Sequence, residues 1–101
     1  MLWITNLPRS THLYVFAYDV VRGSARAKVA AILENDLARV QKSVFEGRLT
    51  PPQARRLAAR IERVIAPGDS LRMYAVTADG LAASLSLGGM PLAEPSGFLL
   101  F

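Results

Sequence analysis

Residues 13–20 read LYVFAYDV, seven apolar or aromatic side chains and a single carboxylate, Asp19, in the next-to-last position. Aromatic and branched residues at this density are typical of a buried strand. Charged side chains are seldom buried unless another group pairs with them. Asp19 is therefore the residue whose role the rest of the chain has to explain.

The segments after this strand predict alternating helices and strands. Apolar residues between positions 25 and 33 repeat at the spacing of one helix face. Residues 37–47 (LARVQKSVFEG) alternate like a half-buried strand, with Phe45 on the same side as the polar residues. Residues 50–53 (TPPQ) predict a helix start, with a threonine cap, prolines in the first turn and a glutamine that completes a capping box.

The C-terminal third predicts two more strands, residues 71–77 (LRMYAVT) and a short one at 83–87 (ASLSL). The apolar end at 97–101 (GFLLF) is expected to add as an edge strand to its own sheet or a neighbour's. The fold class is α+β, a ferredoxin-like split β-α-β-β-α-β domain with a C-terminal extra strand. The helices would cover one face of the sheet, and a homodimer stacked sheet on sheet would cover the other.

This pattern divides the chain into an N-terminal extension (1–12), a ferredoxin-like domain (13–89) and a C-terminal arm with its edge strand (90–101). The 101 residues are 51% hydrophobic and contain no cysteine, which excludes thiolate catalysis and cysteine-based zinc sites. The apolar runs are too short to cross a bilayer, and the first twelve residues do not resemble a signal peptide. We expect a cytoplasmic protein with no membrane partner.

Twelve Lys and Arg against eight Asp and Glu give a net charge of +4, which suits a polyanion such as nucleic acid. The alternative is an ordinary solvated surface that keeps a small domain soluble. No P-loop or GxGxxG motif occurs, and there is a single histidine. The candidate nucleic-acid-binding residues form one set around the first helix and second strand and another on the second helix: Arg22, Arg26, Lys28, Arg39, and Arg55, Arg56, Arg60, Arg63.

Two interpretations of Asp19 follow from the residues alone. Its carboxylate could bind a hard divalent cation, which would activate water or neutralise a phosphodiester. It could instead cap the next turn or pair with an arginine such as Arg22 or Arg26. One carboxylate per chain is a weak metal site, but a dimer would bring two copies of Asp19 together. We expect Phe45 to be exposed on the polar side of the strand at 37–47, where it could stack on a base or anchor a dimer interface.

Several stretches resemble the CRISPR-associated Cas2 family: YDV at the end of the first strand, RxKV in the first helix, RVQKSVFEG, and LRMYAV. The similarity runs in order through residues 13–89. The resemblance implies a ferredoxin-like homodimer that serves CRISPR adaptation, binds the Cas1 integrase and holds the duplex DNA of a new spacer. Many family members are described as magnesium-dependent endoribonucleases and some as deoxyribonucleases. The resemblance therefore also implies a nuclease that uses Mg²⁺ or another divalent cation, with single-stranded RNA as a possible further partner.

The resemblance also assigns residues. Asp19 matches the aspartate that coordinates the metal across the dimer axis, which makes it the candidate catalytic residue and Mg²⁺ ligand. The family's basic positions fall on Arg26, Lys28 and Arg39, and its supporting or interface positions on Tyr18, Ser43 and Phe45. The loop after Asp19 carries no acid, unlike many family members, so Asp19 is the one candidate ligand there. A purely architectural DNA-binding subunit and a toxin-type ferredoxin-like ribonuclease remain as alternatives.

Overall fold

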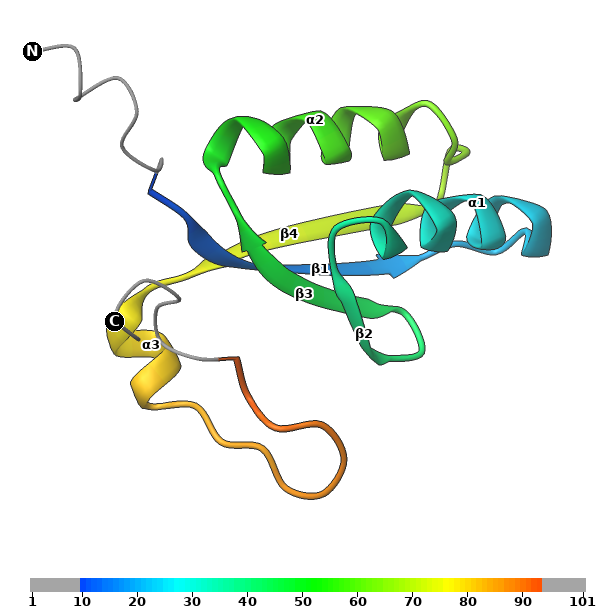
Figure 1. The fold of residues 1–101 in the computed structure, drawn as a ribbon. Coiled ribbons are helices and arrows are strands. Elements are labelled where there is room, and N and C mark those ends of the chain that lie inside the picture. The colour runs from blue at the N-terminus through cyan, green and yellow to red at the C-terminus, as the bar shows by residue number, and fades with distance from the viewer. Residues whose placement is uncertain (1–9, 94–101) are drawn as a thin grey trace, which may run out of the picture.

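The sheet has the stretch 13–20 near its centre. The computed structural model describes residues 10–93. Strand β1 (His12–Asp19) pairs with β3 (Val44–Leu49) on one side and with β4 (Ser70–Val76) on the other, and β2 (Ala38–Gln41) lies outside β3. The order is β2-β3-β1-β4, with every neighbouring pair antiparallel (Figure 1). Because β1 has a partner on both edges, it carries the densest apolar sequence.

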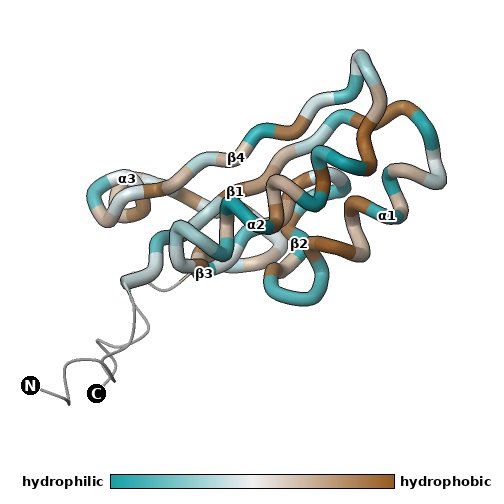
Figure 2. The backbone as a smooth tube through the Cα atoms, turned by 90° about the horizontal axis from the view of Figure 1, so that it is seen from above, coloured by the Kyte–Doolittle hydropathy of each residue, from teal (hydrophilic) through white to brown (hydrophobic). Residues whose placement is uncertain are grey.

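Two helices cover one face of this sheet. Helices α1 (Gly23–Glu34) and α2 (Pro51–Glu62) lie on the same side, and Figure 2 shows them next to each other above the strands. The short helix α3 (Ala78–Ala82) and the chain that follows it lie on the other side (Figure 1). The element order confirms the predicted ferredoxin-like split β-α-β-β-α-β domain.

The hydrophobic core fills the space between the sheet and α1 and α2. Alternate residues of β1 point into it, since successive side chains of a strand leave on opposite faces. The helices contribute the apolar stripe that their spacing predicts. The largest fully buried side chains of the core are Phe16, Phe45, Leu33, Ile61 and Val29.

The predicted start of α2 is confirmed. Thr50 Oγ1 accepts a hydrogen bond from the Gln53 N–H at 3.3 Å, and Gln53 Oε1 accepts one from the Thr50 N–H at 2.8 Å. This reciprocal pair satisfies two backbone donors that the helix itself leaves unpaired. The prolines occupy the first helical positions, where their missing N–H costs nothing.

The single strand predicted over residues 37–47 is wrong, because the chain turns back at Lys42 and Ser43. Strands β2 and β3 form a hairpin in which Gln41 lies opposite Val44, with an irregularity in register between Arg39 and Gln41. The turn contains no glycine, asparagine or proline, and Ser43 is a weaker turn signal than any of these. Alternation continues on both arms of a hairpin, so the sequence pattern resembled one strand.

The strand predicted at 83–87 is also wrong. Helix α3 precedes it, with Thr77 as its cap: Thr77 Oγ1 accepts a hydrogen bond from the Gly80 N–H at 3.1 Å. Residues 84–87 have no regular secondary structure, and Leu85 and Leu87 are exposed. The alternating pattern of this segment finds no strand partner within residues 10–93.

The edge strand predicted at 97–101 and most of the extension predicted at 1–12 lie outside the described residues. The division of the chain into extension, domain and arm therefore stays a prediction. Within the described residues, no helix has both the length and the apolar character needed to cross a bilayer.

Candidate nucleic-acid interface and metal site

The end of β1 sends two candidate site residues to opposite faces of the sheet. Tyr18 is buried on the side of the helices, where it belongs to the core cluster. Asp19 follows it and is exposed on the other face, which we call the open face. Its cross-strand neighbour on β4 is Ser70. The carboxylate that the apolar sequence suggested was buried is therefore in contact with solvent, because it stands at the last position of the strand.

The loop after Asp19, residues 20–22, is fixed on one side by Asp69. Asp69 Oδ1 accepts a hydrogen bond from the Val21 N–H at 3.1 Å, and Oδ2 accepts one from the Ala66 N–H at 2.9 Å. Both bonds stabilise the charged carboxylate, so the backbone amide of Ala66, and then that of Val21, lower the pKa of Asp69. Gly68, with φ of 94°, allows the chain to turn tightly just before it.

Arg26 of α1 fixes the same loop from the other side. Its Nη1 donates to the carbonyl oxygens of Val20 and Val21, at 3.2 and 2.7 Å. A guanidinium has five N–H donors, so these bonds leave Nη2 and Nε available for another ligand. The loop that connects the Asp19 strand to α1 is thus held through both its carbonyl and its amide groups, and by two separate elements.

Asp19 offers one exposed carboxylate, a type of ligand that divalent cations prefer. Mg²⁺ keeps several water ligands and is usually held by one or two carboxylates. Among the described residues, no group of three or more His, Asp and Glu side chains lies close enough together to hold a metal ion. The exposed carboxylate of one chain would hold such an ion only together with water and a further oxygen ligand.

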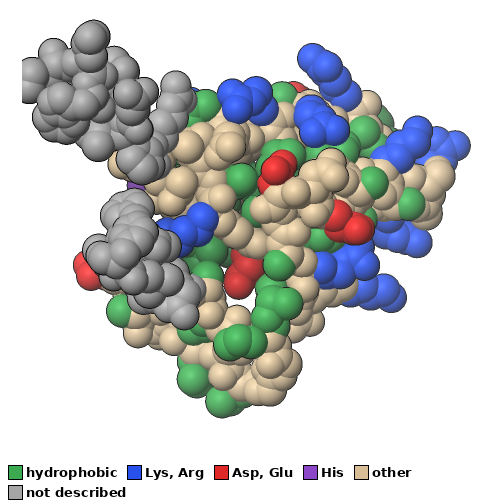
Figure 3. All heavy atoms as spheres, viewed as in Figure 1, with side chains coloured by type: hydrophobic (Ala, Val, Ile, Leu, Met, Phe, Trp, Pro, Cys, Tyr) green, Lys and Arg blue, Asp and Glu red, His purple; other side chains and the backbone are tan. Residues whose placement is uncertain are grey.

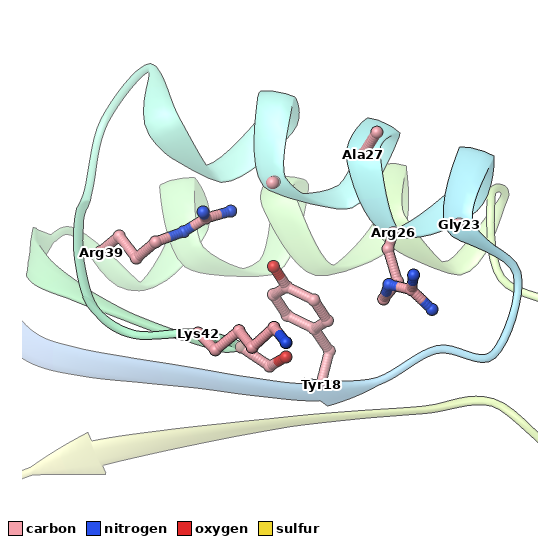
Figure 4. Close-up of a pocket in the computed structure, with 8 residues that line it drawn as sticks. Tyr18, Gly23, Arg26, Ala27, Arg39 and Lys42 are labelled. Carbon is pink, nitrogen blue, oxygen red and sulfur yellow. The ribbon is translucent and has the colours of Figure 1, made fainter.

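The helix side of the same strand end contains a basic pocket of about 260 Å³ (Figure 4). Arg26 reaches it from α1, Arg39 from β2, and Lys42 from the β2–β3 turn, around the ring of Tyr18. The turn is tied to β1 by a hydrogen bond from the Tyr18 N–H to the Ser43 carbonyl at 3.0 Å. The pocket is lined by Tyr18, Gly23, Arg26, Ala27, Ala30, Arg39, Lys42 and Ser43.

Phe45 lies beneath this pocket and is fully buried, so the prediction that it is exposed is wrong. Its ring stacks on that of Tyr18 with centroids 6.3 Å apart, and the Arg39 guanidinium carbon lies 5.0 Å from its centroid. Phe45 and Arg39 are direct cross-strand neighbours, so they do share a face as predicted. That face is covered by the helices, which removes Phe45 from contact with a base or a partner chain.

The other candidate bases form two further groups on the helix side. Arg22, Lys28 and Arg63 line a hollow of about 170 Å³ between the start of α1 and the end of α2. The remaining three are exposed along α2: Arg55, Arg56 and Arg60. Figure 3 shows Lys and Arg side chains spread over this side of the molecule and around the end where α1 begins. The structure therefore gathers the predicted bases on the helix side, away from the open face of Asp19.

A family model described as CRISPR associated protein Cas2 matches residues 12–82, which include every candidate site residue. The chain belongs to the CRISPR-associated Cas2 family. A curated relative from Synechocystis, named CRISPR-associated endoribonuclease Cas2 3, is 36% identical over 89 residues, which make up 87% of this chain and 97% of the relative.

Solved structures agree with the Cas2 assignment. A hypothetical protein from Thermus thermophilus superposes with a TM-score of 0.69 at 36% identity, covering 81% of this chain and 99% of that one. A chain of a partial Cas6-RT-Cas1–Cas2 complex superposes with a TM-score of 0.68 at 32% identity, covering 82% and 92%. At these identities, the likeness extends beyond a shared fold.

Two residues of this candidate site, Lys42 and Asp69, were not predicted from the sequence. Lys42 stands inside RVQKSVFEG, whose alternating pattern predicts a continuous strand, and the structure places it instead on a turn beside the pocket. Asp69 follows Pro67-Gly68, and an aspartate after such a pair is a recognisable turn signal. Its second bond, to a residue 48 positions earlier, has no local signature in the sequence.

Proposed function

We propose that this chain is a dimeric nucleic-acid-binding subunit of the CRISPR spacer-integration complex, acting in the cytoplasm with a Cas1 integrase as its partner. The observation that carries this proposal is the collection of exposed bases on the helix side, in three groups supplied by α1, α2 and the β2–β3 hairpin. Such a surface suits the phosphate backbone of duplex DNA, which is bound largely without regard to sequence. The likeness to a chain of a Cas1–Cas2 complex supports the partner.

The open face supports a homodimer. Its central residues are apolar and only half-buried, among them Val15, Ala17 and Val44. Tyr74, on edge strand β4, is 49% exposed. An open sheet face with such residues is suited to packing against a second sheet. A two-fold axis across this face would bring the two copies of Asp19 toward each other if the ends of the β1 strands meet there.

We further propose that the Asp19 pair holds Mg²⁺ and that the dimer cleaves RNA. Curated relatives are named endoribonucleases, which supports the RNA-cleaving part of this proposal. When bound, a hard divalent ion activates water or neutralises charge on the phosphodiester. The chain's own contribution is to present the Asp19 oxygens at a fixed strand end. Arg26 and Asp69 hold the adjoining loop and so limit its movement.

Substitution of Asp19 separates the enzymatic from the architectural function. Purified wild type and Asp19→Ala are compared for cleavage of single-stranded RNA with Mg²⁺ and with EDTA, and both are tested for spacer acquisition in cells. Asp36→Ala is the matched control, because Asp36 is also exposed and lies in the turn after α1. We expect Asp19→Ala to lose metal-dependent cleavage and to keep spacer acquisition, while Asp36→Ala keeps both.

Two other outcomes have clear meanings. If wild type cleaves no more RNA than Asp19→Ala, the nuclease proposal fails and the architectural subunit is the better description. If neither protein supports acquisition when Cas1 is present, the adaptation role fails. Family membership favours the adaptation role over a toxin-type ribonuclease.

A further inference from the structure

We propose that the basic pocket beneath α1 is a binding site for one phosphate group and that it works without the metal. The inference rests on the proposed nucleic-acid function and gives it a specific contact point. It concerns the helix side of β1, where Tyr18 and the three cations lie, and not the open face that carries Asp19.

The charges around the pocket indicate that its ligand is an anion. Arg26, Arg39 and Lys42 approach the Tyr18 ring from three different elements (Figure 4). None of the eight lining residues is an aspartate or a glutamate. Like charges that converge on one hollow repel each other, and an anion placed between them relieves that repulsion.

Two of the cations are already held in position. The Arg39 guanidinium lies over the buried Phe45 ring. Arg26 is fixed through Nη1 by two backbone carbonyls. Its Nη2 lies beside Gly23, so closely that a Cβ added to that glycine would be 3.4 Å away. Because these side chains are ordered before a ligand arrives, binding loses less conformational entropy. A planar guanidinium matches phosphate oxygens, and Lys42 adds a point charge.

The size and walls of the pocket favour a phosphate over a base. Its volume of about 260 Å³ lies below the range of roughly 300–1,000 Å³ that encloses a whole small-molecule ligand. Its one aromatic lining residue, Tyr18, is only 7% exposed and is stacked on Phe45. Proteins that hold single-stranded bases usually offer an open aromatic face for stacking. The hydroxyl groups of Tyr18 and Ser43 can donate to phosphate oxygens instead.

The test is an NMR titration of the ¹⁵N-labelled full-length chain in EDTA, with inorganic phosphate and with pyrophosphate. We expect saturable shifts of the amides that line the pocket, such as those of Ala27 and Ser43. Lys42→Gln should weaken binding about tenfold, because a charged donor is lost from a solvent-exposed turn without disturbing the core. Tyr18→Phe keeps the stacked ring and removes the hydroxyl, so it should weaken binding by a smaller factor.

Arg72→Gln is the matched charge control. Arg72 is exposed and lies on the open face, where its Nη1 donates to Tyr74 Oη at 3.0 Å. Removal of its charge should change phosphate affinity by no more than about twofold, since Arg72 is solvent-exposed on the opposite face of the sheet, where water and salt screen its charge. Equal weakening by Lys42→Gln and Arg72→Gln would mean that phosphate responds only to net charge, and the inference would be wrong.

A second arm identifies the source of the phosphate and separates this inference from the proposed function. Short oligonucleotides with and without a 5′-phosphate compete with pyrophosphate in EDTA. Competition by the phosphorylated one alone assigns the pocket to a terminal phosphate, and equal competition assigns it to a backbone phosphodiester. If neither competes, the pocket takes free phosphate and the proposed nucleic-acid contact fails while the pocket stands. If duplex DNA binds but phosphate and pyrophosphate give no saturable shift in the pocket, the inference fails while the proposed function stands.

Discussion

Truncation of Phe45 tests whether this residue belongs to the core or to a surface. Phe45 is fully buried, stacks on Tyr18 and supports the Arg39 guanidinium. Replacement of a buried phenylalanine by alanine costs about 3–5 kcal/mol, and the ring contacts add a further fraction. A domain of this size has a total stability of about 5–15 kcal/mol. We therefore expect Phe45→Ala to lose a large share of its free energy of unfolding.

The assay is urea denaturation followed by circular dichroism, at two protein concentrations about tenfold apart, with a thermal scan beside it. At about 4–8 °C per kcal/mol for a small domain, the melting temperature should fall by at least about 12 °C. A core residue should show the same loss at both concentrations. A residue that stabilises only a dimer would show a loss that depends on protein concentration.

Tyr74→Ala is the aromatic control, since Tyr74 is 49% exposed on the open face. At the lower protein concentration its truncation should cost about half as much, in proportion to the area that one chain removes from water. If Phe45→Ala costs under about 1 kcal/mol, or no more than Tyr74→Ala, the assignment of Phe45 to the core is refuted. Phe45→Leu gives a smaller loss in the same direction and keeps the test valid if the alanine variant does not fold.

Further perturbations test the loop, the helix cap and the basic surface. The hydrogen bonds to Asp69 lower its folded pKa below the unfolded value, so its stabilisation is complete above about pH 5 and is lost as the pH falls through the folded pKa. Urea denaturation at pH 2–6 should thus show a steeper acid loss for wild type than for Asp69→Asn, and equal slopes would contradict the bonds. Thr50→Ala should cost about 1 kcal/mol in the same assay at neutral pH, and no measurable loss would contradict the capping box. Charge reversal at three exposed residues of α2, Arg55, Arg56 and Arg60, should reduce the slope of log K against log salt for duplex binding by up to about 3. An unchanged slope would mean that the phosphate contacts lie elsewhere on the molecule.

Much of the fold could be predicted because its signals are local. The apolar run at 13–20 identified the central strand, and the helical spacing of apolar residues identified α1 and α2. The capping box at Thr50 was predicted to the residue, since both of its hydrogen bonds join residues three apart. The hairpin turn at Lys42 and Ser43 and the helix α3 were missed. Their residues carry weak turn and helix signals, and the alternating pattern around each resembled a strand.

The candidate site shows the same division. The basic residues and Asp19 could be predicted as candidate site residues, since charge and family resemblance can be read from the sequence itself. The sequence could not show that Tyr18 lies at a basic pocket on one face of the sheet while Asp19 lies at a candidate metal site on the other. That depends on which face the helices cover. It also could not show that Asp69 reaches the loop after β1, which lies 48 residues away.

The sequence by itself determined the order of most elements, the family and the chemistry available to the chain. The tertiary structure decided which of those groups meet. Alternation along β1 sends neighbouring side chains to opposite faces, and the packing of α1 and α2 makes one face a core and leaves the other open. For that reason LYVFAYDV contains no buried carboxylate. Tyr18 forms part of a basic pocket on the helix side, and Asp19 ends the strand in solvent on the open face.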